Sequence, residues 1–175
     1  MKFFYCNLIL FCLVLTEISA QKKDKISYKA DELKFRRINK EPVRKLINNV
    51  IFTQGKTKIT CDSANFYNRK NILEAFGNIV ITNPDSSVIK ARKLIYNGES
   101  KIAKLRENVI YTKGDEQIKT NNLDYDLNEK KGYFFNNGEL KDNVNILSSE
   151  FGIFYGNNDL SIFYSGVILV GENYT

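Results

Sequence analysis

The chain has 175 residues, of which 26% are charged and 43% hydrophobic, a balance that excludes a disordered tail and a polytopic membrane protein. Histidine is absent, which excludes a Ser-His-Asp triad, a histidine general base and a histidine-ligated metal. The net charge of +6 arises within residues 21–49, because residues 50–175 carry fifteen acidic and fifteen basic side chains. A basic arm beside a neutral body is weak evidence for nucleic-acid binding, and we expect no nucleic-acid partner.

Residues 1–20 have the pattern of a secretory signal peptide. A basic start is followed by an apolar run over residues 3–15 and by small residues that end at Ala20, which is the order of n-region, h-region and cleavage site. The apolar run is shorter than the ~20 residues that span a bilayer, so an uncleaved membrane anchor is the alternative. A lipoprotein is disfavoured, because Phe11 stands directly before Cys12 where lipid attachment needs a small residue.

Removal of this segment leaves Cys61 as the single cysteine. One cysteine cannot form an internal disulfide, and without a histidine to activate it the thiol is no nucleophile. We therefore interpret Cys61 as a small buried apolar residue.

The rest of the sequence repeats with a period near 30 residues, which is decisive for assigning the fold. Each copy contains an Asn-Val-type alternating strand and a second strand that ends in an aromatic anchor. The anchors are Phe35, Phe66, Tyr96, Tyr125 and Phe154. The alternating strands begin at Val50, Ile79, Val109, Val144 and Val167. The interval before Val144 is longer than the others, which predicts an insertion around residues 136–138.

Period-2 alternation, β-branched and aromatic residues, and turns marked by Gly, Asn and Asp predict an all-β chain. One parity of each strand is apolar in every copy, and this face is expected to form the interior. Two alternatives stay open: a closed core filled by side chains, or an apolar trough that receives a lipid. The interior residues, and candidate lipid-binding residues, are Val50, Phe52, Phe66, Ile79, Ile81, Tyr96, Val109, Tyr111, Tyr125, Val144, Ile146 and Phe154.

Paired carboxylates at Asp124/Asp126 and Asp115/Glu116 fall at turns or on outward strand positions. A glycosidase needs two carboxylates that face each other, and a Ca²⁺ site needs a denser acidic loop. The sequence therefore predicts no enzyme, no cofactor and no metal site.

Several blocks of sequence resemble the OstA-like family, the periplasmic lipopolysaccharide-transport proteins that include LptA and the soluble domain of LptD. They are the Cys-Asp-Ser-Ala block at 61–64, Asn71, and the Glu-Ala-Phe-Gly-Asn-Ile block at 74–79, in the form that looks like that of Bacteroidetes-type bacteria. The five anchors in phase extend the resemblance over about residues 28–175.

The resemblance implies a curved antiparallel β-jelly roll, a folded-over stack of strands whose V-shaped interior holds the acyl chains of lipid A. It also implies head-to-tail stacking through edge strands, with further copies or other Lpt-type transport proteins, in a bridge to the outer membrane. We expect a signal peptide over 1–20, a basic leader over 21–27 and an OstA-like β-repeat domain over 28–175. Because the chain stops soon after Val167, we expect this domain to be truncated at its C-terminus.

Basic side chains could lie at the mouth of such a trough, beside lipid phosphates, or be solvated loop charges. They are Lys56, Lys58, Lys90, Arg92, Lys93 and Lys119. The rival hypothesis for the whole protein is a structural β-solenoid or cell-surface scaffold with a filled core and no lipid ligand.

The signal peptide gives the first prediction. Expression in a Gram-negative host should yield a periplasmic protein whose first residue is Gln21, because signal peptidase cleaves after small residues such as Ala20. Intact mass and N-terminal sequencing check this. A periplasmic product that retains Met1 would instead support the membrane anchor.

Overall fold

The computed structural model describes residues 25–158 and 160–171, and these residues form twelve antiparallel strands. The prediction of an all-β, curved antiparallel fold is confirmed. The predicted signal peptide and its cleavage site lie outside the described residues. Within them, no helix is long and apolar enough to cross a membrane. The strands are β1 (Ser27–Lys29), β2 (Glu32–Ile38), β3 (Glu41–Gln54), β4 (Thr57–Tyr67), β5 (Ile72–Thr82), β6 (Val88–Asn97), β7 (Ile102–Lys113), β8 (Glu116–Asp126), β9 (Lys131–Lys141), β10 (Asn145–Tyr155), β11 (Leu160–Tyr164) and β12 (Ile168–Gly171).

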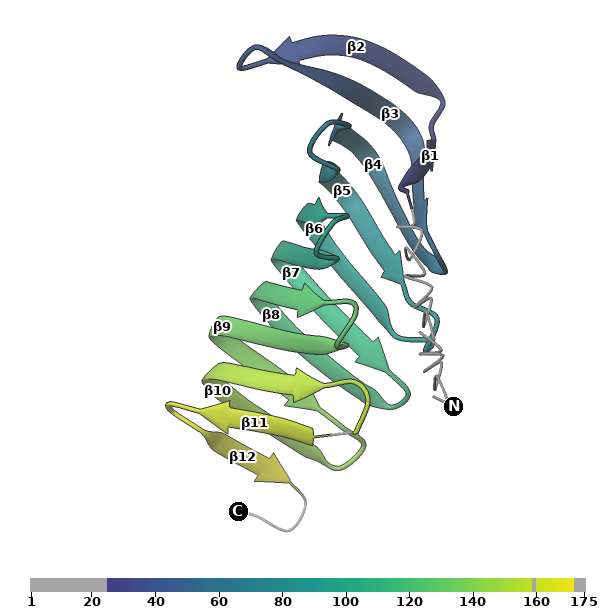
Figure 1. The fold of residues 1–175 in the computed structure, drawn as a ribbon. Helices are drawn as coiled ribbons and strands as arrows, with labels where there is room; N and C mark the ends of the chain where they lie inside the picture. Colours follow the sequence, from purple (N-terminus) through teal and green to yellow (C-terminus); the bar gives the residue numbers. More distant parts are fainter. Residues whose placement is uncertain (1–24, 159, 172–175) are drawn as a thin grey trace, which may run out of the picture.

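The sheet is a meander in which each strand from β3 to β11 pairs with the next along the chain. Strands β1 and β2 both pair with β3, and β10 carries β11 and β12 along different halves of its length. Figure 1 shows the strands stacked into a curved column with the hairpin turns at its sides. Local hairpin pairing therefore builds the whole domain.

The long odd-numbered strands bend in the middle at a two-residue bulge. Residues with positive φ recur there, at Asn48/Asn49 in β3, Gly77/Asn78 in β5, Glu107/Asn108 in β7 and Asn136/Asn137 in β9. In each case the register with the neighbouring strand shifts across the bulge. Asn and Gly tolerate the left-handed conformation best, and a bulge bends the strand that carries it. The Asn of the repeated Asn-Val motif thus lies in the bulge that bends each strand.

These bends fold the sheet into two limbs that face each other. The first limb contains the aromatic anchors from Phe66 onward, and the second contains Phe52, Ile81 and Tyr111. Phe66 pairs with Arg44 and Phe52 lies eight residues further along the same strand, about 26 Å away if the strand were straight. The Phe52 and Phe66 ring centroids are nevertheless 5.9 Å apart. The limbs therefore enclose a common core, as expected for a folded-over stack of strands.

Ten of the twelve predicted interior residues lie in this core, each at most 3% exposed. We call them the seam: Val50, Phe52, Phe66, Ile79, Ile81, Tyr96, Val109, Tyr111, Tyr125 and Phe154. The prediction of which strand face turns inward is correct for these copies.

The interior placement of Val144 and Ile146 was wrong. Val144 precedes β10 and is 50% exposed, and Ile146 is 38% exposed. Leu147 pairs with Leu140, which packs against the core, so the neighbouring Ile146 must point to the opposite face. An Asn-Val dipeptide at a turn imitated the repeat motif.

The true fourth copy is at the bulge of Asn136/Asn137, and its first inward residue is Gly138. Gly138 follows Tyr125 by 13 residues, as Ile79 follows Phe66, so the expected insertion does not exist. A Cβ atom on Gly138 or on Gly152 would overlap the ring of Phe134. One large side chain replaces two aliphatic ones, which hides the repeat from a search for apolar residues.

Two other expectations have clear outcomes. Cys61 is a free, buried cysteine, as predicted. The first aromatic anchor, Phe35, lies on β2 with 75% exposure, so it does not belong to the seam. It pairs with Arg44, the residue that Phe66 flanks from the other side of β3.

The exchange of volume around Phe134 gives the second prediction. Gly138→Val should destabilise the protein by about 1–3 kcal/mol, because the new side chain overpacks against the Phe134 ring. Phe134→Leu should also destabilise it, by creating a void. The double variant restores the Leu105/Val109 combination of the preceding repeat, so its loss should be smaller than the sum of the two single losses. Urea unfolding of the four proteins measures the coupling, and additive losses would contradict this packing account.

Candidate lipid-binding interior

The seam is a column of aromatic rings between the limbs. At the β1 end, Tyr28 contacts Phe52 and Phe66 with centroid distances of 6.0 and 5.7 Å. Further along, Tyr111 contacts Tyr125 at 5.8 Å and Phe154 at 4.6 Å. Rings at these distances add favourable edge and offset contacts to their buried area. The interior is thus filled by side chains, as one of the two sequence alternatives proposed.

Small residues occupy the bottom of the interior, where the strands bend. Cys61, Ala91, Thr120 and Ser149 recur at intervals of 30, 29 and 29 residues, and all are buried. Thr120 donates a hydrogen bond to the carbonyl of Asn137 at 2.7 Å, which ties it to the bulge of β9. Only small side chains fit where the limbs converge.

Surface hollows lie at these bends. One of about 570 Å³ is lined by Asn108, Asn121 and Asn137 and reaches Val109. Another of about 270 Å³ reaches Val50 and Cys61. The exposed lining of the first hollow is mostly apolar, and that of the second is divided about equally between polar and apolar atoms. No aromatic ring of the seam lines either hollow.

The predicted basic residues do not gather at one place. Lys56 lies in a pocket of about 230 Å³ between turns, together with Lys101 and Lys130, which sequence reasoning missed. The other candidates lie within strands β4, β6 and β8, not in loops. Lys93, for example, pairs with Glu107 at 2.6 Å on the outward face.

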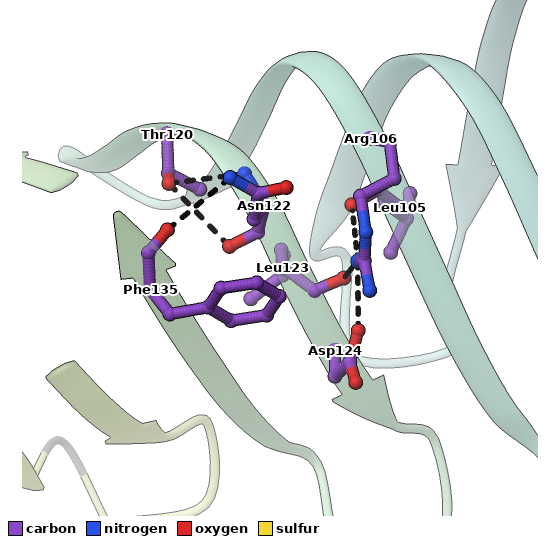
Figure 2. Close-up of polar contacts among 7 residues, drawn as sticks. All are labelled: Leu105, Arg106, Thr120, Asn122, Leu123, Asp124 and Phe135. Carbon is purple, nitrogen blue, oxygen red and sulfur yellow. Dashed lines mark hydrogen bonds and ion pairs between the residues drawn. The ribbon is translucent and has the colours of Figure 1, made fainter. Parts of the chain in front are cut away.

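The carboxylate Asp124 is also on the outward face, as the strand parity predicted (Figure 2). One guanidinium nitrogen of Arg106 donates to Asp124 Oδ1 at 2.8 Å and to the carbonyls of Leu105 and Leu123. The same guanidinium lies over the Phe135 ring at 5.1 Å. Asp124 therefore anchors an arginine that links β7, β8 and β9 on the outside of the sheet.

Polar residues at the limb ends were not identified from the sequence. Tyr96 donates its hydroxyl to Gln54 Oε1 at 2.5 Å, so the aromatic seam ends in a hydrogen bond between the limbs. Burial raises the pKa of Tyr96 beyond its ordinary value of 10.0. The sequence does place a polar residue, such as Gln54, at the end of successive alternating strands. Polar residues are common in all turns, so this pattern does not predict a hydrogen bond between the limbs.

The family model described as "OstA-like protein" matches residues 22–175. No curated protein matches the sequence. Among solved structures, the chain is similar to LptH, described as the LptA homologous periplasmic component of the conserved lipopolysaccharide transport device from Pseudomonas aeruginosa. That similarity has a TM-score of 0.35 and 12% identity, and it covers 84% of this chain and 94% of that chain.

The buried thiol gives the third prediction. Burial, with repulsion from Asp62, raises the pKa of Cys61 from 9.0 to about 12. A pKa raised by folding means that this contribution to stability is complete below pH 9 and is lost as pH rises toward 12. Cys61→Ala, which copies Ala91 of the next repeat, removes the effect. Between pH 8.5 and 10.5 the stability of the wild type should fall faster than that of the variant, as chemical denaturation will measure. Parallel pH profiles would refute the assignment.

Proposed function

Because the chain belongs to the OstA-like protein family, we propose that it is a periplasmic lipid-binding module that carries lipopolysaccharide toward the outer membrane. The match of the family model over residues 22–175 carries the proposal. The lipid would lie with its acyl chains against the seam, between the two limbs, and with its phosphates in water. Such transport requires binding and release, and no bond is made or broken.

Lipid binding would exchange contacts between seam residues for contacts between the seam and an acyl chain. The seam residues are already buried against one another, so separating the limbs exposes apolar surface to water. An inserted acyl chain covers that surface again and buries its own methylenes, each worth ~0.8 kcal/mol. The net affinity is therefore much smaller than the gross burial of the chains suggests, which suits a carrier that must release its ligand.

The repeat supports movement along the domain. An inward aliphatic or aromatic residue recurs every 29 or 30 residues on both limbs, as in Phe66, Tyr96 and Tyr125. Successive positions of a lipid would then have similar binding free energies, and no position would trap it. A site built once, from a single cluster of residues, would not have this property.

The two ends of the sheet support stacking with related domains. Strand β12 exposes Ile168, Leu169 and Val170, and β2 exposes Leu33 and Phe35. Exposed apolar strands at a sheet edge are templates for pairing with another chain. We propose that these edges join further copies or other Lpt-type proteins head to tail.

A scaffold with a filled core and no lipid ligand is the second candidate. The observation that favours it is the packed seam itself, since seam residues that are at most 3% exposed leave no open trough. The strands of this protein pair antiparallel, whereas the stacked coils of a β-helix solenoid pair in parallel. The fold therefore does not fit the solenoid form of this candidate, and the scaffold form is the one that stays. The two candidates differ in whether the limbs separate.

A photo-crosslinking experiment gives the fourth prediction. A photoreactive amino acid at Phe52, Ile81 or Tyr111 should capture lipopolysaccharide, whereas one at Thr53 or Thr82, which point outward, should not. Capture should change little between low and high salt, because acyl burial is not screened. Mass spectrometry of the crosslinked protein measures both.

Two results would contradict the proposal. Capture at Thr82 that equals capture at Ile81 would indicate nonspecific surface contact. Crosslinks confined to residues 25–49 and lost at high salt would indicate that the basic arm binds phosphates, and the interior would then be an ordinary core.

A further inference from the structure

The two limbs end in two rows of hairpin turns. The first row, at the ends of the second limb, consists of the turns that join β3 to β4, β5 to β6, β7 to β8 and β9 to β10. The second row, at the ends of the first limb, includes the turns that join β4 to β5, β6 to β7 and β8 to β9, and the residues that follow β10. The mouth of the interior is the line along which these two rows meet. A molecule can enter between the limbs along this line, at either end of the column, or by crossing the sheet.

Three side-chain contacts join the rows across the mouth. Gln54 Nε2 donates to the carbonyl of Gly98 at 2.8 Å, and Lys113 Nζ donates to the carbonyl of Gly156 at 2.7 Å. Between them, Lys130 Nζ lies 3.2 Å from Asp85 Oδ2. We call these three contacts the latches.

The latches recur in register with the repeat. Their members are 44, 45 and 43 residues apart in the sequence. The residues of the first row, Gln54, Asp85 and Lys113, follow one another at intervals close to one repeat. Three successive turns of the first row are thus tied to the second row at nearly the same offset. A single fortuitous surface contact would not repeat in this way.

The latches differ in kind from the bonds within the limbs. Strand pairing in the described residues follows the order of the meander, with β10 carrying β11 and β12, so backbone ladders hold each limb together. Across the mouth, the contacts that we describe depend on side chains. The limbs can therefore move apart about the bulges while the ladders stay intact, as hinges at element boundaries allow.

The central latch lies over a group of buried polar side chains. Asp85 accepts hydrogen bonds from the backbone N–H and the hydroxyl of Ser87, at 3.1 and 2.7 Å. Asn83 donates its side-chain amide to the Ser87 hydroxyl at 3.0 Å. The hydroxyls of Tyr111 and Tyr125 are buried nearby and interact with Ser87 and with each other. The turn at residues 83–87 therefore positions the carboxylate of the central latch.

We infer that the mouth is the entrance through which acyl chains reach the seam, and that the three latches hold it closed when no lipid is bound. The identity of the ligand rests on the proposed function, but the closing action of the latches does not. Release of a latch costs one or two side-chain contacts, whereas entry through the sheet would break a ladder of backbone hydrogen bonds.

A single cysteine at the level of the rings reports this opening from inside the protein. Ala103 is fully buried and pairs with Tyr96 and Tyr125 of the neighbouring strands. Cys61 borders a surface hollow at the bend, so it is replaced. The full chain with Cys6→Ser, Cys12→Ser, Cys61→Ala and Ala103→Cys has one thiol. The rate of its alkylation by iodoacetamide, measured without lipid at several low urea concentrations, gives the frequency of opening and the surface that opening exposes.

The test compares Lys130→Met and Gln54→Leu with Lys93→Met. Lys130→Met removes the central latch, and Gln54→Leu removes the latch to Gly98 together with the hydrogen bond that Tyr96 donates to Gln54. Lys93→Met removes an exposed ion pair with Glu107 on the outward face. Each latch variant should alkylate about five- to tenfold faster, with a shallow urea dependence, while Lys93→Met stays at the parent rate. Latch variants at the parent rate, or a urea dependence as steep as that of global unfolding, would overturn the closing action.

Lipid A tests the entrance separately. In chains with a photoreactive residue at Ile81, latch removal should raise the initial rate of lipid A capture in parallel with the alkylation rate. Faster alkylation with an unchanged capture rate would overturn the mouth as the entrance. If no variant captures lipid A, the proposed function and the entrance both fail, whereas the alkylation result still decides whether the latches close the limbs.

Discussion

The structure depends on one backbone constraint, the two-residue bulge with positive φ that interrupts each long odd-numbered strand. Without it, a twelve-strand meander would remain an open sheet with one apolar face in water, which is unstable for a chain of this size. Repeated at Asn48/Asn49, Gly77/Asn78, Glu107/Asn108 and Asn136/Asn137, the bulge turns one half of the sheet onto the other. A single sheet then supplies both walls of its own core.

The bends also explain why the interior and the rim have different chemistry. At the bend the limbs converge, so only small residues such as Cys61 and Ala91 fit. In the middle the gap is wide enough for paired rings, as between Tyr111 and Phe154. At the mouth the walls meet water, and side chains such as Gln54 and Lys113 carry polar atoms across the gap. Distance from the bend therefore sets the size and polarity of the residue at each level.

Much of this was predictable because a strand has a period of two and the repeat fixes its phase. Alternation and the repeat together identified ten seam residues, since an inward parity error would place charges such as Lys58 in the core. The fourth copy was not predictable from apolar pattern, because Gly138 and Gly152 carry no side chain and Phe134 fills their space. The latches were hidden for another reason. They join residues 43 to 45 positions apart, and polar residues at turns carry no information about such distant partners.

A filled interior and a lipid-carrying function are opposed only if the limbs are fixed relative to each other. The bonds that define the fold are ladders within each limb, and they are independent of the angle between the limbs. What sets that angle is the packing of the seam, which an acyl chain can replace with contacts of the same apolar kind, and the few polar contacts at the mouth. Apolar packing is not directional, so the seam can pack equally well against the opposite limb or against an acyl chain. Hydrogen bonds such as that of Gln54 to Gly98 are directional and specify the closed geometry. Under the proposed function, the apolar core excludes water, and the polar contacts at the mouth decide whether the limbs stay closed or open around a lipid.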